Sequence, residues 1–217
     1  MSHHELVVFD WDGTLMDSTH VIAASLRAAC ADVSVAVPTE ADARYVIGLG
    51  LEDTFNHVAP TLDAEGRRRL SERYRFHFLA REGEAALYPG VAEMLADLHG
   101  RGRRLAVATG KARRGLERAL DQTGLRAWFE ATRCADEGFA KPHPDMLLML
   151  LDMTGVDPAR AVMVGDTTHD LELAANAGVD AVAVTYGAHP PELLDTRPAV
   201  ARCASVPELH RWLAASG

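Results

Sequence analysis

The chain has 217 residues, 48% of them hydrophobic, and a formal net charge of −9 from 31 acidic residues against 22 Lys and Arg. This composition excludes a disordered chain and suits one domain, or one domain with an insertion. Such an acidic surface disfavours nucleic acid and anionic membranes as partners. Cys30, Cys134 and Cys203 lack metal or redox spacing, which predicts reduced thiols in a cytoplasmic protein. We expect neither a membrane span nor a leader segment.

The first predicted element is a short buried strand, Leu6–Phe9, which ends in Asp10 and, one residue later, Asp12. Side chains alternate along extended backbone, so these two carboxylates tend to face the same way. They repel each other unless a cation or a shared proton relieves them. Gly13 permits an immediate sharp turn, and Thr14 adds a hydroxyl. This pattern is typical of a metal-assisted nucleophile.

Residues 16–87 contain no predicted strand and lead to a turn at Tyr88-Pro89-Gly90. Because this segment follows the first strand directly, we expect a small helical module inserted into the fold above the ligand crevice. The predicted division is a core of residues 1–15 and 88–217 and a helical cap of residues 16–87. The predicted cap helices are His20–Cys30, Thr39–Ile47, Leu51–Val58 and Ala64–Arg81.

The rest of the chain alternates between short apolar runs and helical patterns. This alternation predicts an α/β fold, with a Rossmann-like three-layer core in which helices cover both faces of a parallel sheet. The predicted strands are Leu105–Ala108, Ala161–Val164 and Ala181–Val184, with Thr132–Ala135 as a further candidate; the predicted helices are Arg113–Thr123, Pro144–Thr154 and Leu171–Ala177, each followed by glycine.

Polar residues follow two of these strands, as they follow Leu6–Phe9. Thr109 and Gly110 follow one, Asp166 and Asp170 follow another, and Lys141 lies between them beside a proline. The carboxyl ends of parallel strands meet at one crevice, so we expect these side chains to converge there.

These residue types suit phosphoryl transfer. Asp10 is the candidate nucleophile, and Asp12 the acid that protonates the leaving oxygen and then activates water. Asp10 and Asp166 supply hard oxygen ligands for Mg²⁺, and a backbone carbonyl near Asp12 can supply another. We expect Thr109, Gly110 and Lys141 to hold the phosphate oxygens. Asp170 and Thr14 are expected to support these groups without binding the metal themselves.

Each of these residues, taken alone, also suits an ordinary structural role. Asp170 alone fits a helix cap or a local salt bridge as well as an anchor for Lys141, and Thr109 or Thr167 alone fits a helix cap. Lys141 alone is more typical of a surface lysine. These segments follow one another in this order along consecutive α/β units, which favours one shared functional site over separate structural roles.

Four segments resemble the motifs of haloacid dehalogenase superfamily phosphatases, in the subfamily of phosphoglycolate phosphatases. They are Asp10-Trp11-Asp12-Gly13-Thr14-Leu15, Thr109-Gly110, Lys141-Pro142 and Gly165–Asp170. The resemblance implies Mg²⁺-dependent phosphomonoester hydrolysis, with Asp10 as nucleophile and Asp12 as acid and base. It also implies metal contacts from Asp10, the Asp12 carbonyl and Asp166. Dehalogenases lack an aspartate at the position of Asp12, so dehalogenation is disfavoured. Trp11 replaces a more common aliphatic residue, and we expect it in the core.

The choice of substrate is expected to lie in the cap. Gly48, within Ile47–Gly50, permits close backbone approach, and Arg44 suits a carboxylate or phosphate; a helix-ending turn with an exposed arginine is an equal alternative. For Lys111 and Arg113 we favour solvated cations over substrate contacts, and for His169 an exposed bystander.

Four functions remain open on sequence grounds. The preferred one is a phosphatase that hydrolyses a small phosphorylated metabolite, such as 2-phosphoglycolate, a sugar phosphate or a nucleotide, through an aspartyl-phosphate, as a monomer or homodimer. The second is a phosphomutase of the β-phosphoglucomutase type, for which no retaining cap groups are identified. The third is a phosphoacceptor receiver module, which resembles this chain in phosphorylating an aspartate but is much shorter and has no cap. The fourth is a catalytically silent phosphate-binding or interaction protein, against which the intact set of residues argues.

Overall fold

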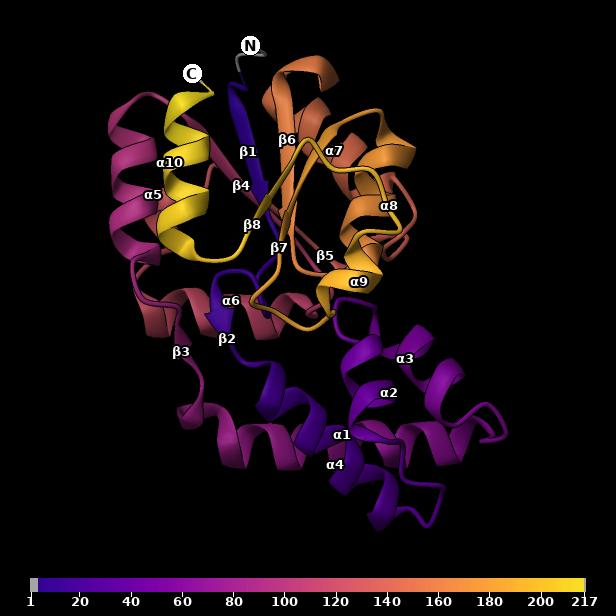
Figure 1. The fold of residues 1–217 in the computed structure, drawn as a ribbon. Helices are drawn as coiled ribbons and strands as arrows, with labels where there is room; N and C mark the ends of the chain where they lie inside the picture. Colours follow the sequence, from indigo (N-terminus) through magenta and orange to yellow (C-terminus); the bar gives the residue numbers. More distant parts are fainter. Residues whose placement is uncertain (1–3, 217) are drawn as a thin grey trace.

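The structure, a computed structural model, describes residues 4–216 and has two parts (Figure 1). One is built on a six-stranded sheet of order β5-β4-β1-β6-β7-β8. The other is a lobe of helices that lies beyond the carboxyl ends of the strands. Neighbouring strands of the sheet are parallel, which confirms the predicted α/β class. The strands are β1 (Leu6–Phe9), β4 (Arg104–Thr109), β5 (Ala131–Cys134), β6 (Ala161–Gly165), β7 (Asp180–Val184) and β8 (Ala201–Cys203).

Strand β1 is the strand around which the polar residues gather. It pairs with β4 on one side and β6 on the other, and Phe9 lies opposite both Val107 and Val164. This register brings the residues that follow β1, β4 and β6 together at the carboxyl ends of the strands. That end of the sheet faces the helical lobe (Figure 1). All of β1 is buried, as expected for an inner strand covered on both faces.

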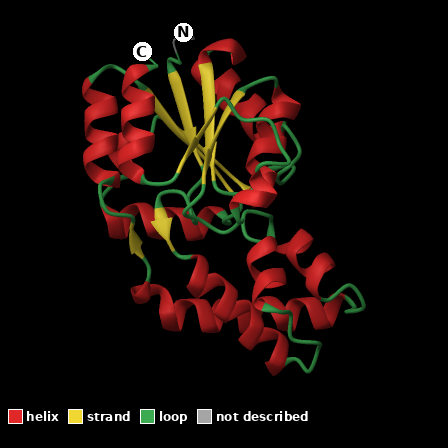
Figure 2. Ribbon diagram, viewed as in Figure 1, coloured by secondary structure: helices red, strands yellow, loops and turns green. Residues whose placement is uncertain are grey.

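Helices cover both faces of the sheet (Figure 2). They are α5 (Val91–Gly100), α6 (Arg113–Thr123), α7 (Asp145–Thr154), α8 (Thr168–Ala177), α9 (Pro191–Leu194) and α10 (Val206–Ala215). Val7 and Phe9 of β1 pack with α5, α6 and α10, whereas Leu6 and Val8 pack with α7 and α8. This alternation follows from extended backbone and confirms the three-layer arrangement.

The helical lobe has a core of its own. It contains α1 (Thr19–Asp32), α2 (Glu40–Tyr45), α3 (Leu51–Val58) and α4 (Ala64–Arg81). Leu26, Phe55 and Leu70 are buried together between these helices. Two short strands, β2 (Met16–Asp17) and β3 (Ala86–Leu87), form an antiparallel pair where the chain enters and leaves the lobe. The prediction that residues 16–87 contain no strand was therefore wrong, because a two-residue strand shows no alternation of side chains.

Several elements of the sheet part were not predicted: α5, α9, α10 and the edge strand β8. The candidate strand at residues 132–135 is confirmed as β5. Trp11 is fully buried and packs edge-on to Phe129 in the core, as expected. Cys30, Cys134 and Cys203 are buried and free, as predicted.

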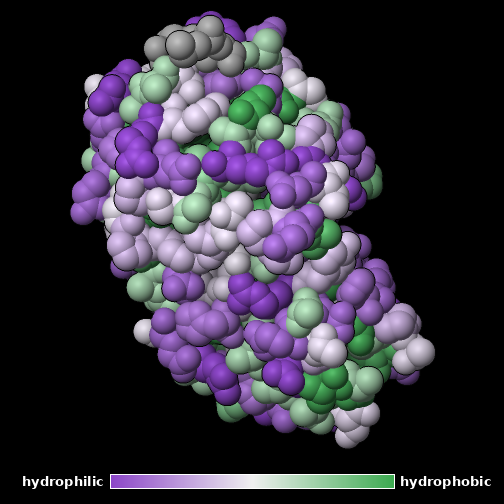
Figure 3. Space-filling model, in the orientation of Figure 1, coloured by the Kyte–Doolittle hydropathy of each residue, from purple (hydrophilic) through white to green (hydrophobic). Residues whose placement is uncertain are grey.

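The surface is mainly hydrophilic on the face drawn in Figure 3, with a hydrophobic area low on the helical lobe. Within residues 4–216, no helix has the length and apolar character needed to cross a membrane.

Candidate active site

Asp10 follows β1 directly and lies at the centre of a buried cluster of charges. Its side chain is 1% exposed, and Lys141 Nζ lies 2.8 Å from its Oδ1 atom. Apart from this ion pair, neither carboxylate oxygen has a hydrogen-bond partner among the described residues. Burial raises the pKa of Asp10 to about 7, although the charge of Lys141 opposes the shift. A buried carboxylate with unsatisfied oxygens can accept a cation or attack an electrophile.

Lys141 is a buried lysine held between two carboxylates. It precedes α7, and its Nζ atom lies 2.6 Å from Asp170 Oδ1 as well as near Asp10. Burial by itself would lower the pKa of Lys141, but the charges of Asp10 and Asp170 outweigh it and raise the pKa. The structure therefore places a permanent positive charge beside Asp10, where the sequence pattern alone suited a surface lysine.

Asp170 fulfils two of the roles that the sequence left open. It occupies the third position of α8 and accepts hydrogen bonds from the Thr167 amide (3.1 Å) and hydroxyl (2.6 Å), which makes a capping box at the start of this helix. Its other oxygen anchors Lys141. A Cβ atom on Gly165 would lie 2.3 Å from the Asp170 Cβ, so the end of β6 admits only glycine here without a shift.

Asp166 is fully buried at the end of β6, and both of its oxygens are held. Thr14 donates a hydrogen bond to Oδ1 at 2.8 Å, and the Ala188 amide donates one to Oδ2 at 2.7 Å. Burial, followed by the charges of Asp10 and Asp170, raises the pKa of Asp166 well above its usual range. Gly13 has a φ of 84°, and a Cβ there would lie 2.1 Å from Asp166 Oδ2. This contact explains why glycine occupies the turn after Asp12.

The carboxylates of Asp10, Asp166 and Asp170 form a group that could hold a metal ion, with ligand atoms within 4.8 Å of one another. The unsatisfied oxygens of Asp10 and the raised pKa values of Asp10 and Asp166 fit an added cation. Carboxylate oxygens are the ligands that Mg²⁺ prefers. The side chain of Asp12 is not part of this group, so its predicted contribution to a metal site rests on its backbone carbonyl.

The side chain of Asp12 has partners of its own. Ser18 donates a hydrogen bond to Asp12 Oδ1 at 2.6 Å, and Lys111 Nζ lies 3.0 Å from the same atom. The Lys111 side chain is only 13% exposed, so the preference for a solvated lysine was wrong. Ser18 was not predicted at all, and no spacing rule points to it.

Thr109 and Gly110 lie at the end of β4, opposite the loop between α2 and α3. Thr109 is fully buried, and its hydroxyl accepts a hydrogen bond from the Lys111 amide at 3.2 Å. A Cβ on Gly110 would lie 2.5 Å from the Gly48 carbonyl oxygen and 2.6 Å from that of Leu49. The lobe therefore touches the sheet part through backbone atoms at this point.

A cavity of about 220 Å³ lies between the two parts of the molecule. Asp10, Asp12, Thr109, Gly110 and Gly48 all line it, so the structure brings together predicted residues from both parts.

Arg44 lies elsewhere, outside the lining of this cavity. Its guanidinium donates hydrogen bonds to the carbonyls of Gly187 (2.7 Å) and Ala188 (3.3 Å) and to Thr19 Oγ1 (3.3 Å). These bonds join α2 to the loop that follows β7, next to the amide that holds Asp166. The arginine thus connects the lobe to the sheet part.

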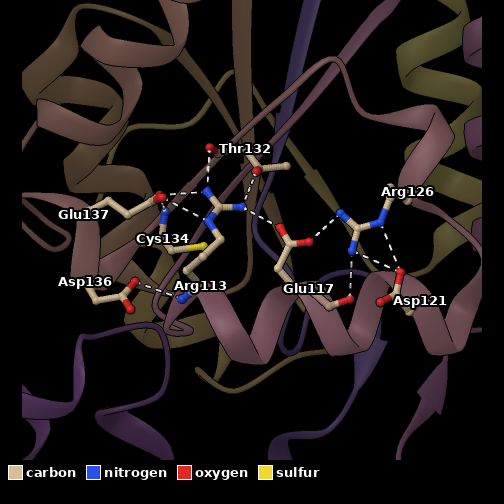
Figure 4. Close-up of polar contacts among 8 residues, drawn as sticks. All are labelled: Arg113, Glu117, Asp121, Arg126, Thr132, Cys134, Asp136 and Glu137. Carbon is tan, nitrogen blue, oxygen red and sulfur yellow. Dashed lines mark hydrogen bonds and ion pairs between the residues drawn. The ribbon is translucent and has the colours of Figure 1, made fainter.

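Arg113 belongs to a network of ion pairs on the sheet part (Figure 4). It donates to Glu137 Oε2 at 2.7 Å and to Thr132 Oγ1 at 2.7 Å, and it also pairs with Glu117, which Arg126 contacts from its other side. These contacts tie α6 to β5 and its following turn, which explains Arg113 without a substrate.

His169 is buried, so the expectation of an exposed bystander was wrong. The Nε2 atoms of His169 and His189 each lie 2.9 Å from the backbone oxygen of Tyr45, and the Tyr45 ring stacks on His189 at 5.2 Å. Burial lowers the pKa of both histidines. They form a second contact between α2 and the sheet part.

Comparisons with known proteins place these features in a family. Residues 7–184 match the family model of haloacid dehalogenase-like hydrolases. The chain is 38% identical over 190 residues to a protein of Dickeya dadantii named "Probable phosphatase IndB", covering 85% of this chain and 82% of that protein. It is 36% identical over 187 residues to a phosphoglycolate phosphatase of Caulobacter vibrioides, covering 83% and 79%. A crystal structure described as a predicted phosphatase from Clostridium acetobutylicum superposes with a TM-score of 0.87 at 26% identity, covering 99% and 100%.

Proposed function

Since the chain belongs to the haloacid dehalogenase-like hydrolase family, we propose that it is a Mg²⁺-dependent phosphatase that hydrolyses small phosphomonoesters through a phosphorylated Asp10. The observation that carries the proposal is the environment of Asp10. It is a buried carboxylate whose oxygens have no partner among the described residues except Lys141, and it lies beside Asp166 and lines a cavity.

Asp10 and Asp12 would divide the reaction into two steps. An oxygen of Asp10 attacks phosphorus, the ester P–O bond breaks, and the leaving alkoxide takes a proton from Asp12. A water molecule then gives a proton to Asp12 and attacks the same phosphorus, which breaks the bond to Asp10 and releases inorganic phosphate. Ser18 and Lys111 hold Asp12 for both proton transfers.

Mg²⁺ bound by Asp10, Asp166 and the Asp12 carbonyl would neutralise phosphate charge and keep Asp10 ionised. Thr14 and the Ala188 amide donate hydrogen bonds to Asp166 and would keep its carboxylate in place for this role. Lys141, Thr109 and the Gly110 amide would hold the other phosphate oxygens as their charge redistributes. Asp170 keeps Lys141 in place.

The helical lobe would act as a cap over the phosphoryl site. We assign residues 16–87 to it and residues 1–15 and 88–217 to the core. The contact of Gly110 with the Gly48 carbonyl supports a closed arrangement that excludes water, and opening would release the product. The unpaired buried cysteines support a reducing compartment, and we place the protein in the cytoplasm.

The test is phosphate release from a panel of small phosphate esters, with and without Mg²⁺, by the wild-type protein and Asp10→Asn. We expect metal-dependent release that the variant loses while keeping its fold, because the amide is nearly isosteric but a poor nucleophile. A well-folded Asp10→Asn with wild-type turnover would contradict the proposal. A phosphomutase would instead return the phosphoryl group to its substrate and release little phosphate.

A further inference from the structure

The cavity beside Asp10 has walls of unlike chemistry. On the core side its lining is polar and carries three cations; it includes Asp12, Thr109, Lys111, Arg114 and Arg118. On the lobe side it is lined by apolar side chains from α1, the loop after α2, and α4: Ile22, Leu26, Val46, Ile47, Leu49 and Phe78. The phosphoryl group belongs on the core side, so the apolar side faces the rest of the substrate.

Lys111 marks the boundary between the two sides. Its Nζ atom lies 3.0 Å from Asp12 Oδ1 and 4.9 Å from the centre of the Phe78 ring. An ester oxygen that takes a proton from Asp12 would therefore lie next to Lys111, and the carbon atoms bonded to it would continue along Phe78. Ile22 and Leu26 line the same side and give these carbon atoms an apolar surface.

The polar groups on the lobe side are few. They are the hydroxyls of Thr54, Ser71 and Tyr74 and the guanidinium of Arg75, and no carboxylate or carboxamide of the described residues lines that side. A polyhydroxylated substrate would leave hydroxyls against Ile22 and Leu26, and each buried polar group without a partner is strongly disfavoured. An apolar substrate body loses nothing there and gains from leaving water.

We propose that the preferred substrates are phosphomonoesters of short apolar alcohols, and that Ile22, Leu26 and Phe78 select them against sugar phosphates. The inference rests on the phosphatase function proposed above, because it names the alcohol that Asp12 would release. The cavity of about 220 Å³ has room for roughly seven water-sized groups, which suits a phosphoryl group and a short alcohol.

A matched set of esters tests the substrate class. Ethyl, propyl and butyl phosphate are compared with erythritol 4-phosphate, the polyol counterpart of the butyl ester, and with 2-phosphoglycolate. We expect kcat/KM to rise about 3- to 4-fold for each added methylene group and butyl phosphate to exceed the polyol ester. The hydroxyl beside the ester makes the polyol the better leaving group, so a preference for butyl phosphate reports the pocket. A polyol ester or 2-phosphoglycolate that equals or exceeds butyl phosphate overturns the proposal.

Two threonine variants test the assigned wall. Ile22 lines the cavity. Val58 does not line it and packs instead against the buried core of the lobe. We expect Ile22→Thr to lower the ratio of kcat/KM for butyl over ethyl phosphate by about 3- to 10-fold, and Val58→Thr to leave that ratio unchanged. If the two variants have the same ratio of kcat/KM for butyl over ethyl phosphate, Ile22 does not contact the alcohol part of the substrate.

Binding of phosphonates separates this inference from the proposed function. Ethyl- and butylphosphonate cannot be hydrolysed, and calorimetry with wild-type protein and Mg²⁺ measures their affinities without turnover. Absence of phosphate release from every ester would contradict the phosphatase function alone. Tighter binding of butylphosphonate supports the apolar pocket in either case, and equal binding of the two phosphonates overturns it.

Discussion

The Nζ atom of Lys111 lies 3.0 Å from Oδ1 of Asp12, in a side chain that is almost covered by its surroundings. This ion pair joins the residue after the second motif to the proposed acid of the first. Arg113 is the first residue of α6 and Lys111 lies two residues before it, yet of these two only Lys111 lines the cavity. The difference arises from partners on the sheet part that hold Arg113 away from it.

These two cations give a matched pair of variants. Lys111→Met is expected to lower kcat by about 10- to 100-fold, because Asp12 loses the charge that positions it for proton transfer. Arg113→Met removes an equal charge from the ion-pair network and is expected to leave kcat within about 2-fold while lowering stability by about 1 kcal/mol. Steady-state kinetics and thermal unfolding measure the two effects. A larger loss of kcat in Arg113→Met than in Lys111→Met would contradict the assignment.

Lys141 should be the most damaging single charge to remove. Lys141→Met leaves Asp10 and Asp170 buried without their cation, and we expect it to lower the free energy of unfolding by about 3–5 kcal/mol. Lys141→Met combined with Asp170→Asn removes one of the two stranded charges, so the double variant should be more stable than the single one. Urea unfolding without metal measures both. If the second substitution adds further destabilisation, the charges are not coupled as described.

Binding of Mg²⁺ should depend on pH through Asp10. In the metal-free protein burial raises the pKa of Asp10 from 3.8 to about 7, so the folded state holds this proton more tightly than the unfolded chain. Asp10 therefore costs stability as the pH rises from 3.8 to about 7, and a bound cation offsets that cost. Below pH 7 the cation must displace the proton, which weakens its binding. We expect the rise in Tm produced by Mg²⁺ to be larger at pH 8 than at pH 6.

The variant Asp10→Asn controls this pH dependence, because its amide does not titrate. Its Mg²⁺-induced shift in Tm should be small at both pH values. A wild-type shift that is equal at pH 6 and pH 8 would show that Asp10 is not the proton that the cation displaces.

Alanine substitutions at two glycines with left-handed backbone separate the effect of backbone strain from that of a steric clash. Gly13 has a φ of 84° and Gly124 a φ of 71°, so alanine is strained at both, at about 1 kcal/mol. Only at Gly13 does the new Cβ meet Asp166, at 2.1 Å; nothing lies within 4 Å of it at Gly124. Gly13→Ala should lose the Mg²⁺-induced shift in Tm and lower turnover by about 10- to 100-fold, whereas Gly124→Ala should keep both. Equal retention of activity would contradict the role of Gly13.

Much of this molecule could be predicted from the sequence, because its strands and motifs are local patterns. The run Leu6–Phe9 followed by Asp10 gives a strand and its end within a few residues. The core fold follows from repeating that pattern. Short elements such as β2 and β3 carry too few residues to show a period. The buried leucines of α5 and α10 recur at helical spacing, so these two unpredicted helices do carry a sequence signal.

The parts of the site that escaped prediction depend on long-range contacts. The backbone amide of Ala188, 22 residues from Asp166 in the sequence, donates a hydrogen bond to it. Because every residue except proline has such an amide, the residue type gives no sign of this role. Ser18 is close to Asp12 in sequence, but its hydroxyl also suits a helix cap. Arg44 has the chemistry of a substrate ligand, and only the fold shows that the carbonyls of Gly187 and Ala188 occupy it.

The most direct test of Asp10 as nucleophile is to trap the covalent intermediate on it. Protein turning over a phosphate ester with Mg²⁺ is quenched, treated with borohydride, which reduces an acyl phosphate to an alcohol, and mapped by peptide mass spectrometry. We expect homoserine at position 10, dependent on substrate, with Asp12 and Asp166 unchanged. Reduction at another aspartate, or rapid phosphate release with no reduced residue under any quench, would contradict Asp10 as the nucleophile.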